Sequence, residues 1–188
     1  GRKKRKKFFR YQLREFFLLA REEGLDMETF KGSYAGAIGM PQFMPNNYRQ
    51  LAVDFDGDGV KNILGSASDS IGSVANYLSH HGWRSDQLVY LGAVLKRGQT
   101  LTIPKNVGRI NETLEGIQAL DFNSLGLSKT TPAAVLSFKE GGSNRYWVAF
   151  ENFYVLFRYN PRVKYALVVA LLATALEKEC NIDSSLTR

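Results

Sequence analysis

The chain has 188 residues, of which 44% are hydrophobic and 12% aromatic. That composition can bury a sizeable core, and it excludes a chain that is disordered throughout. The formal net charge of +7 at pH 7 favours an acidic partner, such as nucleic acid, an anionic membrane surface or an anionic cell-wall polymer.

The first expected element is a helix over residues 8–23, because hydrophobic residues such as Phe9 and Leu13 recur there at helical spacing. Gly24 is a natural stop for this helix. Much of the excess positive charge lies just before it, in a basic run at residues 2–7. Nothing downstream resembles a nucleic-acid module, so we interpret the run as a solvated lead-in and expect no nucleic-acid partner.

A glycine-rich segment with two prolines follows at residues 31–45. It is too apolar for a solvent-exposed loop and too rich in glycine for an ordinary helix. Such a composition favours a backbone that packs closely or approaches a ligand. A short helix is expected directly after it, capped by the side chain of Asn46 or Asn47.

The strongest local pattern is an EF-hand-like loop at residues 54–65, with oxygen ligands at positions one, three and five and Gly59 at the sharp turn. Position twelve is Gly65 in place of the usual bidentate glutamate, and Asp69 is either a replacement ligand or only a helix cap. The candidate ligands are Asp54, Asp56, Asp58, the Val60 carbonyl and Asp69. The loop therefore predicts a structural Ca²⁺ or Na⁺ site, with an ordinary Asx-rich turn as the alternative.

The remaining elements alternate between helices and short β-prone runs. One helix is expected over residues 70–81, capped by Asp69 or Ser70, and the last one runs from a cap at Asn160 to residue 179. Residues 85–150 predict a small α+β subdomain between them. Its expected elements are strands at residues 89–95, 101–103, 133–138 and 145–150 and a short helix near residues 112–120.

The sequence thus predicts an α+β protein that is mainly α, divided into a first core part at residues 1–84, the subdomain at 85–150 and a return to the core at 151–188. Cys180 is the single cysteine, so no internal disulfide can form. The longest uncharged apolar stretch, residues 165–176, is well short of the roughly 20 residues that span a membrane. It predicts a core helix.

A second candidate site is distributed along the chain. Amides and hydroxyls beside aromatic rings suit a sugar-binding groove, because rings stack on pyranose faces while polar groups bind sugar hydroxyls. The residues of this kind are Ser33, Gln42, Met44, Tyr154, Tyr159, Asn160 and Tyr165. Core and cap roles for the tyrosines and the asparagine remain the alternative.

Several of these segments resemble one family in order along the chain. They are GSYAGAIGMPQFMP at residues 32–45, AVDFDGDG at 52–59, IGSVANY at 71–77, HGW at 81–83, NFY at 152–154, RYN at 158–160 and Tyr165. Together they resemble the membrane-bound lytic murein transglycosylase B family over residues 8–175. The resemblance implies a lysozyme-like core carrying the EF-hand-like loop.

The resemblance also implies an activity on peptidoglycan, which is the non-hydrolytic cleavage of the β-1,4 bond between N-acetylmuramic acid and N-acetylglucosamine to leave a 1,6-anhydromuramoyl end. In this family one glutamate serves as general acid and then as general base, in a Glu-x-x-aromatic-Gly segment upstream of the helix expected here from residue 8. No such segment occurs within residues 1–188, so we expect the catalytic glutamate upstream of Gly1. Glu15, Glu22 and Glu23 fit solvent-facing helix positions, and none of them is assigned this role.

By the same resemblance, Ser33 orients the glutamate, Met44 forms an apolar wall, and four residues line the cleft around the muramoyl unit. Those four are Gln42, Tyr159, Asn160 and Tyr165. The resemblance further implies a monomer in the periplasm that needs no chemical cofactor and meets a membrane only through an upstream lipid anchor. Two alternatives stay open: a muramidase like the goose-type lysozymes, in which water captures the intermediate, and a non-catalytic peptidoglycan-binding module.

Overall fold

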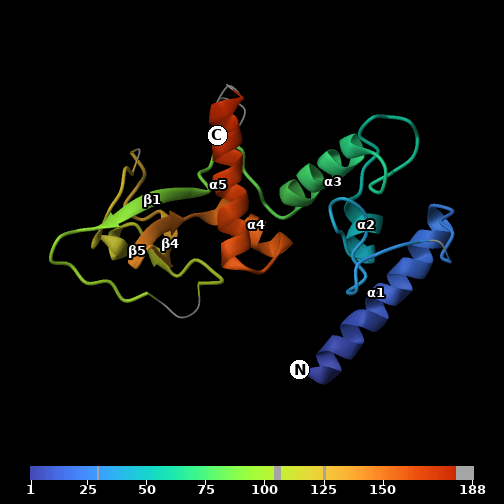
Figure 1. The fold of residues 1–188 in the computed structure, drawn as a ribbon, viewed down its shortest axis with the longest axis horizontal. Coiled ribbons are helices and arrows are strands. Elements are labelled where there is room, and N and C mark those ends of the chain that lie inside the picture. Colours follow the sequence, from blue (N-terminus) through green and yellow to red (C-terminus); the bar gives the residue numbers. More distant parts are fainter. Residues whose placement is uncertain (29, 104–106, 125, 181–188) are drawn as a thin grey trace. The chain divides into compact units, whose positions relative to one another are not determined.

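The computed structural model describes residues 1–28, 30–103, 107–124 and 126–180, and it combines helices with a β-sheet, as the sequence predicts (Figure 1). The chain divides into two compact units, Gly1–His80 and His81–Arg188, and each is described here by itself. The division expected from the sequence at residues 84/85 and 150/151 stays a prediction. Among the described residues, no helix has both the length and the apolar character that a membrane span needs.

The first unit holds three helices, α1 (Arg2–Glu22), α2 (Pro45–Leu51) and α3 (Ala67–His80). Helix α1 begins six residues before the expected start, because lysine and arginine are good helix formers and the basic run continues the helix. Its buried face is partly polar and contains Gln12, Glu15 and Leu19. Phe9 and Leu13, two of the hydrophobic residues that predicted the helix, are exposed within this unit.

Two ion pairs join α1 to α2. The Arg49 guanidinium of α2 bonds the carboxylates of Glu15 and Glu22 on α1, and its hydrogen bonds to Glu22 lower the pKa of that carboxyl. Glu15 is only 4% exposed, so the expectation that it faces solvent is wrong. An arginine fork on two carboxylates fixes the angle between two helices, because it constrains both distance and direction.

The start of α2 differs from the sequence prediction of an asparagine cap. Met44 is the N-cap residue and makes no side-chain cap bond, while Pro45 occupies the first turn, where its missing N–H costs nothing. The buried side chain of Gln12 on α1 instead forms hydrogen bonds to the first turn of α2. Its Oε1 accepts the backbone amide of Asn46 at 3.2 Å, and its Nε2 donates to Asn46 Oδ1 at 2.7 Å.

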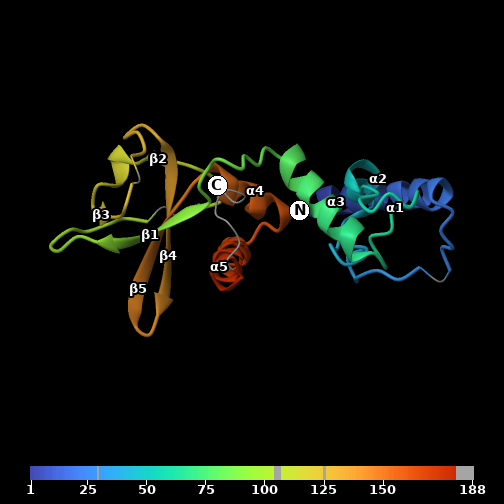
Figure 2. The same cartoon turned by 90° about the horizontal axis from the view of Figure 1, so that it is seen from above.

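The second unit is built on a five-stranded antiparallel sheet of order β2-β4-β5-β1-β3 (Figures 1 and 2). The strands are β1 (Tyr90–Leu95), β2 (Glu112–Thr113), β3 (Leu120–Asp121), β4 (Pro132–Glu140) and β5 (Ser143–Ala149). A cluster of buried hydrophobic residues lies on and beside this sheet. It gathers Leu114, Ile117, Leu120, Ala133, Val135, Val148 and Phe150. The predicted strands around β1, β4 and β5 are confirmed.

Two expectations for this region are wrong. Residues 101–103 form no strand. The short helix expected near residues 112–120 is instead a 3-10 turn, Glu115–Ile117, between β2 and β3. Ile117 and Leu120 bury their side chains against the sheet, so tertiary packing overrides the weak helical pattern of this stretch.

Two helices complete the unit, α4 (Glu151–Tyr159) and α5 (Val163–Glu179). Both lie at the end of the sheet where β1 begins and β5 ends, and the Tyr90 hydroxyl of β1 donates to Thr174 Oγ1 of α5 at 3.2 Å (Figure 2). The sequence prediction missed α4 and placed the start of the last helix at Asn160. Asn160 instead ends α4, and its carbonyl accepts the Arg162 amide at 2.7 Å before α5 begins.

Candidate functional site

The loop between α2 and α3 is organised by carboxylates that accept backbone amides. Asp54 accepts the amides of Gly57, Asp58 and Gly59 at 2.7–3.1 Å, so the first loop position holds the turn that follows it. Asp58 Oδ1 accepts the Val60 amide at 2.8 Å. These bonds fold the loop around its acidic side chains.

Asp69 closes the loop from the inside, and it is not the cap of α3. Its carboxylate is fully buried and accepts the Phe55 amide at 2.8 Å and the Asn62 amide at 2.7 Å. These backbone hydrogen bonds hold the pKa of Asp69 below its usual value. The cap role belongs to Ser66, whose hydroxyl accepts the Asp69 amide at 3.1 Å.

Three of the predicted ligands come together in this loop. Asp54, Asp56 and Asp69 each offer a carboxylate oxygen, and the three oxygens lie within 4.8 Å of one another. Hard oxygens at that spacing fit a Ca²⁺ or Na⁺ ion, since a cation about 2.4 Å from each oxygen can touch all of them. Asp58 lies outside this group of three, so its carboxylate and the Val60 carbonyl stay predicted ligands.

The glycine-rich segment forms a tight hairpin in which Ile38 and Phe43 pair, with N–O distances of 2.7 and 3.0 Å. Gly39 at its turn has φ +67°, and a Cβ there would lie 2.4 Å from the Ile63 carbonyl oxygen. Only glycine fits such a close approach at that backbone angle. The Met40 backbone amide donates to the same Ile63 carbonyl at 2.9 Å. This bond joins the hairpin to the C-terminal end of the loop at residues 54–65, the candidate cation loop.

Gln42 stands exposed on this hairpin in a strained conformation. Its φ is +53°, in the left-handed region that non-glycine residues seldom adopt. The side-chain Nε2 donates to the Gly39 carbonyl at 2.9 Å. A non-glycine residue held at positive φ is common at functional sites, where the backbone conformation fixes the direction of the side chain.

Ser33 and Met44 lie on either side of this hairpin. Ser33 lines an apolar cavity of about 410 Å³ between α1 and the glycine-rich segment, beside Phe16 and Phe30, whereas Gln42 and Met44 do not line it. The Ser33 hydroxyl oxygen accepts the Ala37 amide at 3.0 Å, which leaves its own proton to donate. Such a hydroxyl can orient a carboxylate.

The other three predicted glycan-binding residues belong to the second unit. Tyr159 and Asn160 lie at the end of α4, and Tyr165, 38% exposed, lies in the first turn of α5. Tyr154 of the same candidate set is half-buried, and its hydroxyl donates to the Val107 carbonyl at 2.9 Å.

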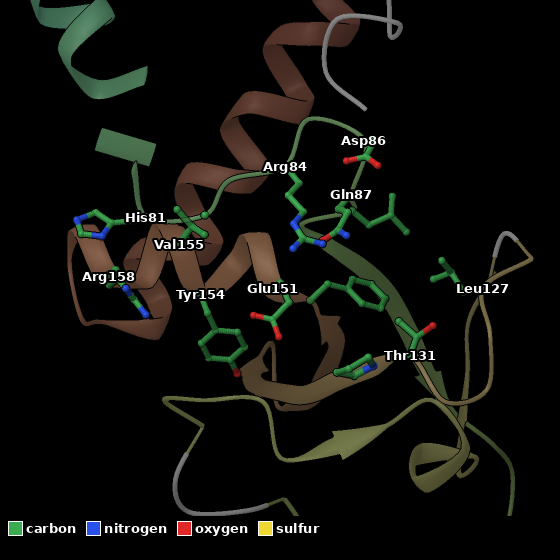
Figure 3. Close-up of a pocket in the computed structure, with 14 residues that line it drawn as sticks. His81, Arg84, Asp86, Gln87, Leu127, Thr131, Glu151, Tyr154, Val155 and Arg158 are labelled. Carbon is green, nitrogen blue, oxygen red and sulfur yellow. The ribbon is translucent and has the colours of Figure 1, made fainter. Parts of the chain in front are cut away.

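The sequence prediction missed a cavity of about 630 Å³ beside α4 in the second unit (Figure 3). The polar residues that line it are His81, Arg84, Asp86, Gln87, Thr131, Glu151, Tyr154 and Arg158. Burial raises the pKa of the Tyr154 hydroxyl to about 12. One wall of the cavity is formed by the irregular stretch at residues 84–87 and another by α4. These two segments are far apart in the sequence, so no periodic pattern in the sequence predicts that they lie together.

Residues 2–174 match the family model for the transglycosylase SLT domain. The chain belongs to this family. It is 39% identical over 180 residues to membrane-bound lytic murein transglycosylase B of Escherichia coli (strain K12), a match that covers 92% of this chain and 47% of that protein. The chain thus spans about half the length of this relative, and the family predicted from its motifs is confirmed.

Solved structures of this family agree in fold. The catenated lytic transglycosylase SltB1 of Pseudomonas aeruginosa is 37% identical with a TM-score of 0.86, covering 95% of this chain and 59% of that one. Escherichia coli SLT35 in complex with calcium is 36% identical with a TM-score of 0.81, covering 94% and 55%. Pseudomonas aeruginosa SltB3 in complex with NAG-anhNAM-pentapeptide is 30% identical with a TM-score of 0.72, covering 89% and 45%.

Proposed function

We propose that this chain is the glycan-binding part of a lytic murein transglycosylase. The reaction would cleave the β-1,4 bond between N-acetylmuramic acid and N-acetylglucosamine without water, leaving a 1,6-anhydromuramoyl end. The family match over residues 2–174 carries this proposal. SltB3 in complex with a fragment that contains an anhydro sugar supports it.

The proposal assigns the general acid and base to a glutamate upstream of Gly1. That glutamate would protonate the leaving oxygen and then take the proton of the C6 hydroxyl, so that the sugar closes its own ring. Ser33 would orient the carboxylate by donating its hydroxyl proton, in line with its place beside an apolar cavity. An apolar cavity wall also favours a protonated acid, because poor solvation raises the pKa of a carboxyl.

Gln42, Tyr159, Asn160 and Tyr165 would bind the muramoyl unit, and Met44 would give it an apolar wall. The fixed backbone of Gln42 supports this assignment, since a preorganised amide loses little entropy when it binds a sugar.

The loop at residues 54–65, together with Asp69 in the first turn of α3, would hold one structural Ca²⁺ or Na⁺. The three convergent carboxylates support this assignment, as does the calcium complex of SLT35. A cation there would neutralise acidic side chains that otherwise repel one another, so it would stabilise the first unit and take no part in the chemistry. We further propose a monomer in the periplasm, with any membrane attachment made through a lipid anchor upstream.

Mass analysis of digested peptidoglycan tests the reaction. We expect the chain, extended by the residues that its gene encodes before Gly1, to release muropeptides with 1,6-anhydro ends. Each such product is about 18 Da lighter than the corresponding hydrolysis product, because no water molecule is added. Reducing ends would instead identify a muramidase. Retention on insoluble peptidoglycan without any cleavage would leave a binding module and overturn the enzymatic proposal.

A further inference from the structure

The cavity beside α4 carries charges of both signs. Arg84 and Asp86 line it from the segment that leads into β1, and Glu151 lines it from the first turn of α4. Within the described part of the chain, the structure records no ion pair for any of these three side chains. In Figure 3 the Arg84 guanidinium points toward the side of the cavity where Glu151 and Tyr154 lie.

The walls of this cavity are fixed by a buried amide. Asn152 on α4 is fully buried, and its Nδ2 donates to the carbonyls of Arg84 at 2.6 Å and Gln87 at 2.8 Å. Its Oδ1 accepts the Arg84 amide at 3.0 Å. One side chain thus satisfies three backbone groups of the opposite wall, so the backbone that carries Arg84 is fixed against the first turn of α4, which carries Glu151.

The rest of the cavity suits a small organic ligand. Phe150, Val155 and Leu88 are apolar residues of its lining, and its volume of about 630 Å³ lies within the range of roughly 300–1,000 Å³ that is usual for ligand pockets. A guanidinium and carboxylates together with apolar side chains complement a ligand with at least one carboxylate, one ammonium group and aliphatic carbon between them. A short peptide has these groups, whereas an unsubstituted sugar chain has none of the charges.

The cavity also adjoins the proposed glycan site along α4. Arg158 lines the cavity, and the next two residues are Tyr159 and Asn160. A muramoyl unit bound by those two residues carries its peptide on the lactyl group. The pentapeptide in the SltB3 complex is a peptide of this kind.

We propose that this cavity binds the peptide stem of a peptidoglycan strand, with Arg84 holding a peptide carboxylate and Glu151, aided by Asp86, holding an ammonium group. This inference rests on the proposed function for its ligand class, and it adds a subsite that reads the peptide state of the glycan. A strand stripped of its peptides would lose this part of the binding.

Calorimetric titration of the 188-residue chain tests the proposal with three probes: the NAG-NAM disaccharide, the same disaccharide with a pentapeptide, and the free pentapeptide. We expect the peptide to raise the affinity of the disaccharide at least about tenfold, which corresponds to one charge-assisted hydrogen bond. Arg84→Gln should remove that gain and leave the affinity for the bare disaccharide unchanged. Arg97→Ala, an exposed arginine that does not line the cavity, is the matched control and should keep the gain.

Blocked peptides separate the two charges. Amidation of the peptide carboxylates should abolish the effect of Arg84→Gln, and acetylation of the ammonium group should abolish the effect of Glu151→Gln, because each variant then removes a contact that the ligand no longer makes. An equal gain from the peptide in Arg84→Gln and in the unchanged chain would overturn the proposal.

The free pentapeptide distinguishes this proposal from the proposed function. Binding of the disaccharide with no gain from the peptide overturns the subsite and leaves the glycan site. Binding of the free pentapeptide that Arg84→Gln abolishes supports the subsite even if the bare disaccharide does not bind, in which case the proposed glycan site fails. No binding of any peptide-bearing probe overturns the subsite.

Discussion

The cation loop and the proposed glycan-binding residues differ in how they are spread along the chain. Asp54 and Asp56 of the loop and Asp69 in the first turn of α3 come from one short segment of the first unit. The proposed glycan-binding residues are divided between the hairpin around Gln42 and the end of α4 around Asn160, in two different units. A local site is built by backbone turns, whereas a distributed site needs several elements to be positioned by packing. Changes to the two regions should therefore have different consequences.

The largest effect is expected from Gln42→Ala in the full-length enzyme, where turnover on peptidoglycan should fall about a hundredfold, the scale seen when a substrate is mispositioned. Thermal stability should be unchanged, because the side chain is exposed and makes one hydrogen bond within its own turn. Gln50→Ala, at an exposed position of α2, is the control and should keep full activity. Unchanged turnover in Gln42→Ala would remove this residue from the proposed site.

Gly39→Ala should have the largest effect on stability. The new Cβ would lie 2.4 Å from the Ile63 carbonyl at a positive φ, so we expect a loss of roughly 2–5 kcal/mol, measured by urea unfolding. Gly36→Ala is matched to it, with φ +83° but nothing within 4 Å of the new Cβ, and should lose only roughly 1–2 kcal/mol. Equal losses in the two variants would show that the contact with Ile63 does not constrain the hairpin.

Removing the cation site should have an intermediate effect. The unchanged chain should gain about 2.7 kcal/mol of stability when calcium is present at a hundred times its dissociation constant. In Asp54→Ala with Asp58→Ala this calcium-dependent difference in melting should vanish, whatever the melting temperature without calcium. Asp121→Ala, on a strand of the other unit, should retain the difference. A response to calcium that survives the double substitution would disprove the loop as the site.

A further effect is expected only in alkali, from one tyrosine in each unit. Burial raises the pKa of Tyr48 and of Tyr154 to about 12, whereas the pKa of a tyrosine in the unfolded chain is about 10. The folded state keeps these protons longer, so stability should be constant below about pH 10 and fall as the pH rises from there to about 12.

Single substitutions separate the two contributions. Tyr48→Phe and Tyr154→Phe should each reduce the fall in the free energy of unfolding between about pH 10 and about pH 12, measured by denaturant unfolding. Each variant also loses the hydrogen bond that its hydroxyl donates, to the Lys61 carbonyl or to the Val107 carbonyl. Tyr34→Phe, at a fully exposed position, should leave the slope as it is. A pH profile identical in all three variants would contradict the assignment.

The same contrast explains what could be predicted from the sequence. The order Asp54, Asp56, Asp58 and Gly59 predicts the loop because ligand spacing is a local property. The place of Asp69 could only be stated as two alternatives, since its bonds to the Phe55 and Asn62 amides depend on how α3 packs. Strands with several hydrophobic residues were located for the same local reason.

Long-range contacts were not predictable in this way. Helix α4 was missed because aromatic residues such as Phe153 and Tyr154 suit a strand as well as a helix. The buried carboxylate of Glu15 depends on Arg49, which lies on another helix. The cavity beside α4 depends on Asn152, whose partners at Arg84 and Gln87 are far away in sequence. The motifs indicated the family without any of this geometry, and the glycan-binding residues inferred through the family stay a prediction.

One atom described above limits how this protein could be re-engineered. The Ile63 carbonyl accepts the Met40 amide of the hairpin and the Ser70 hydroxyl of α3, and it lies at the exit of the cation loop. A foreign loop of different length, grafted between α2 and α3, would displace this oxygen and shift Gln42 with it. We therefore expect that this loop can be exchanged with that of a relative only if the hairpin is transferred together with it.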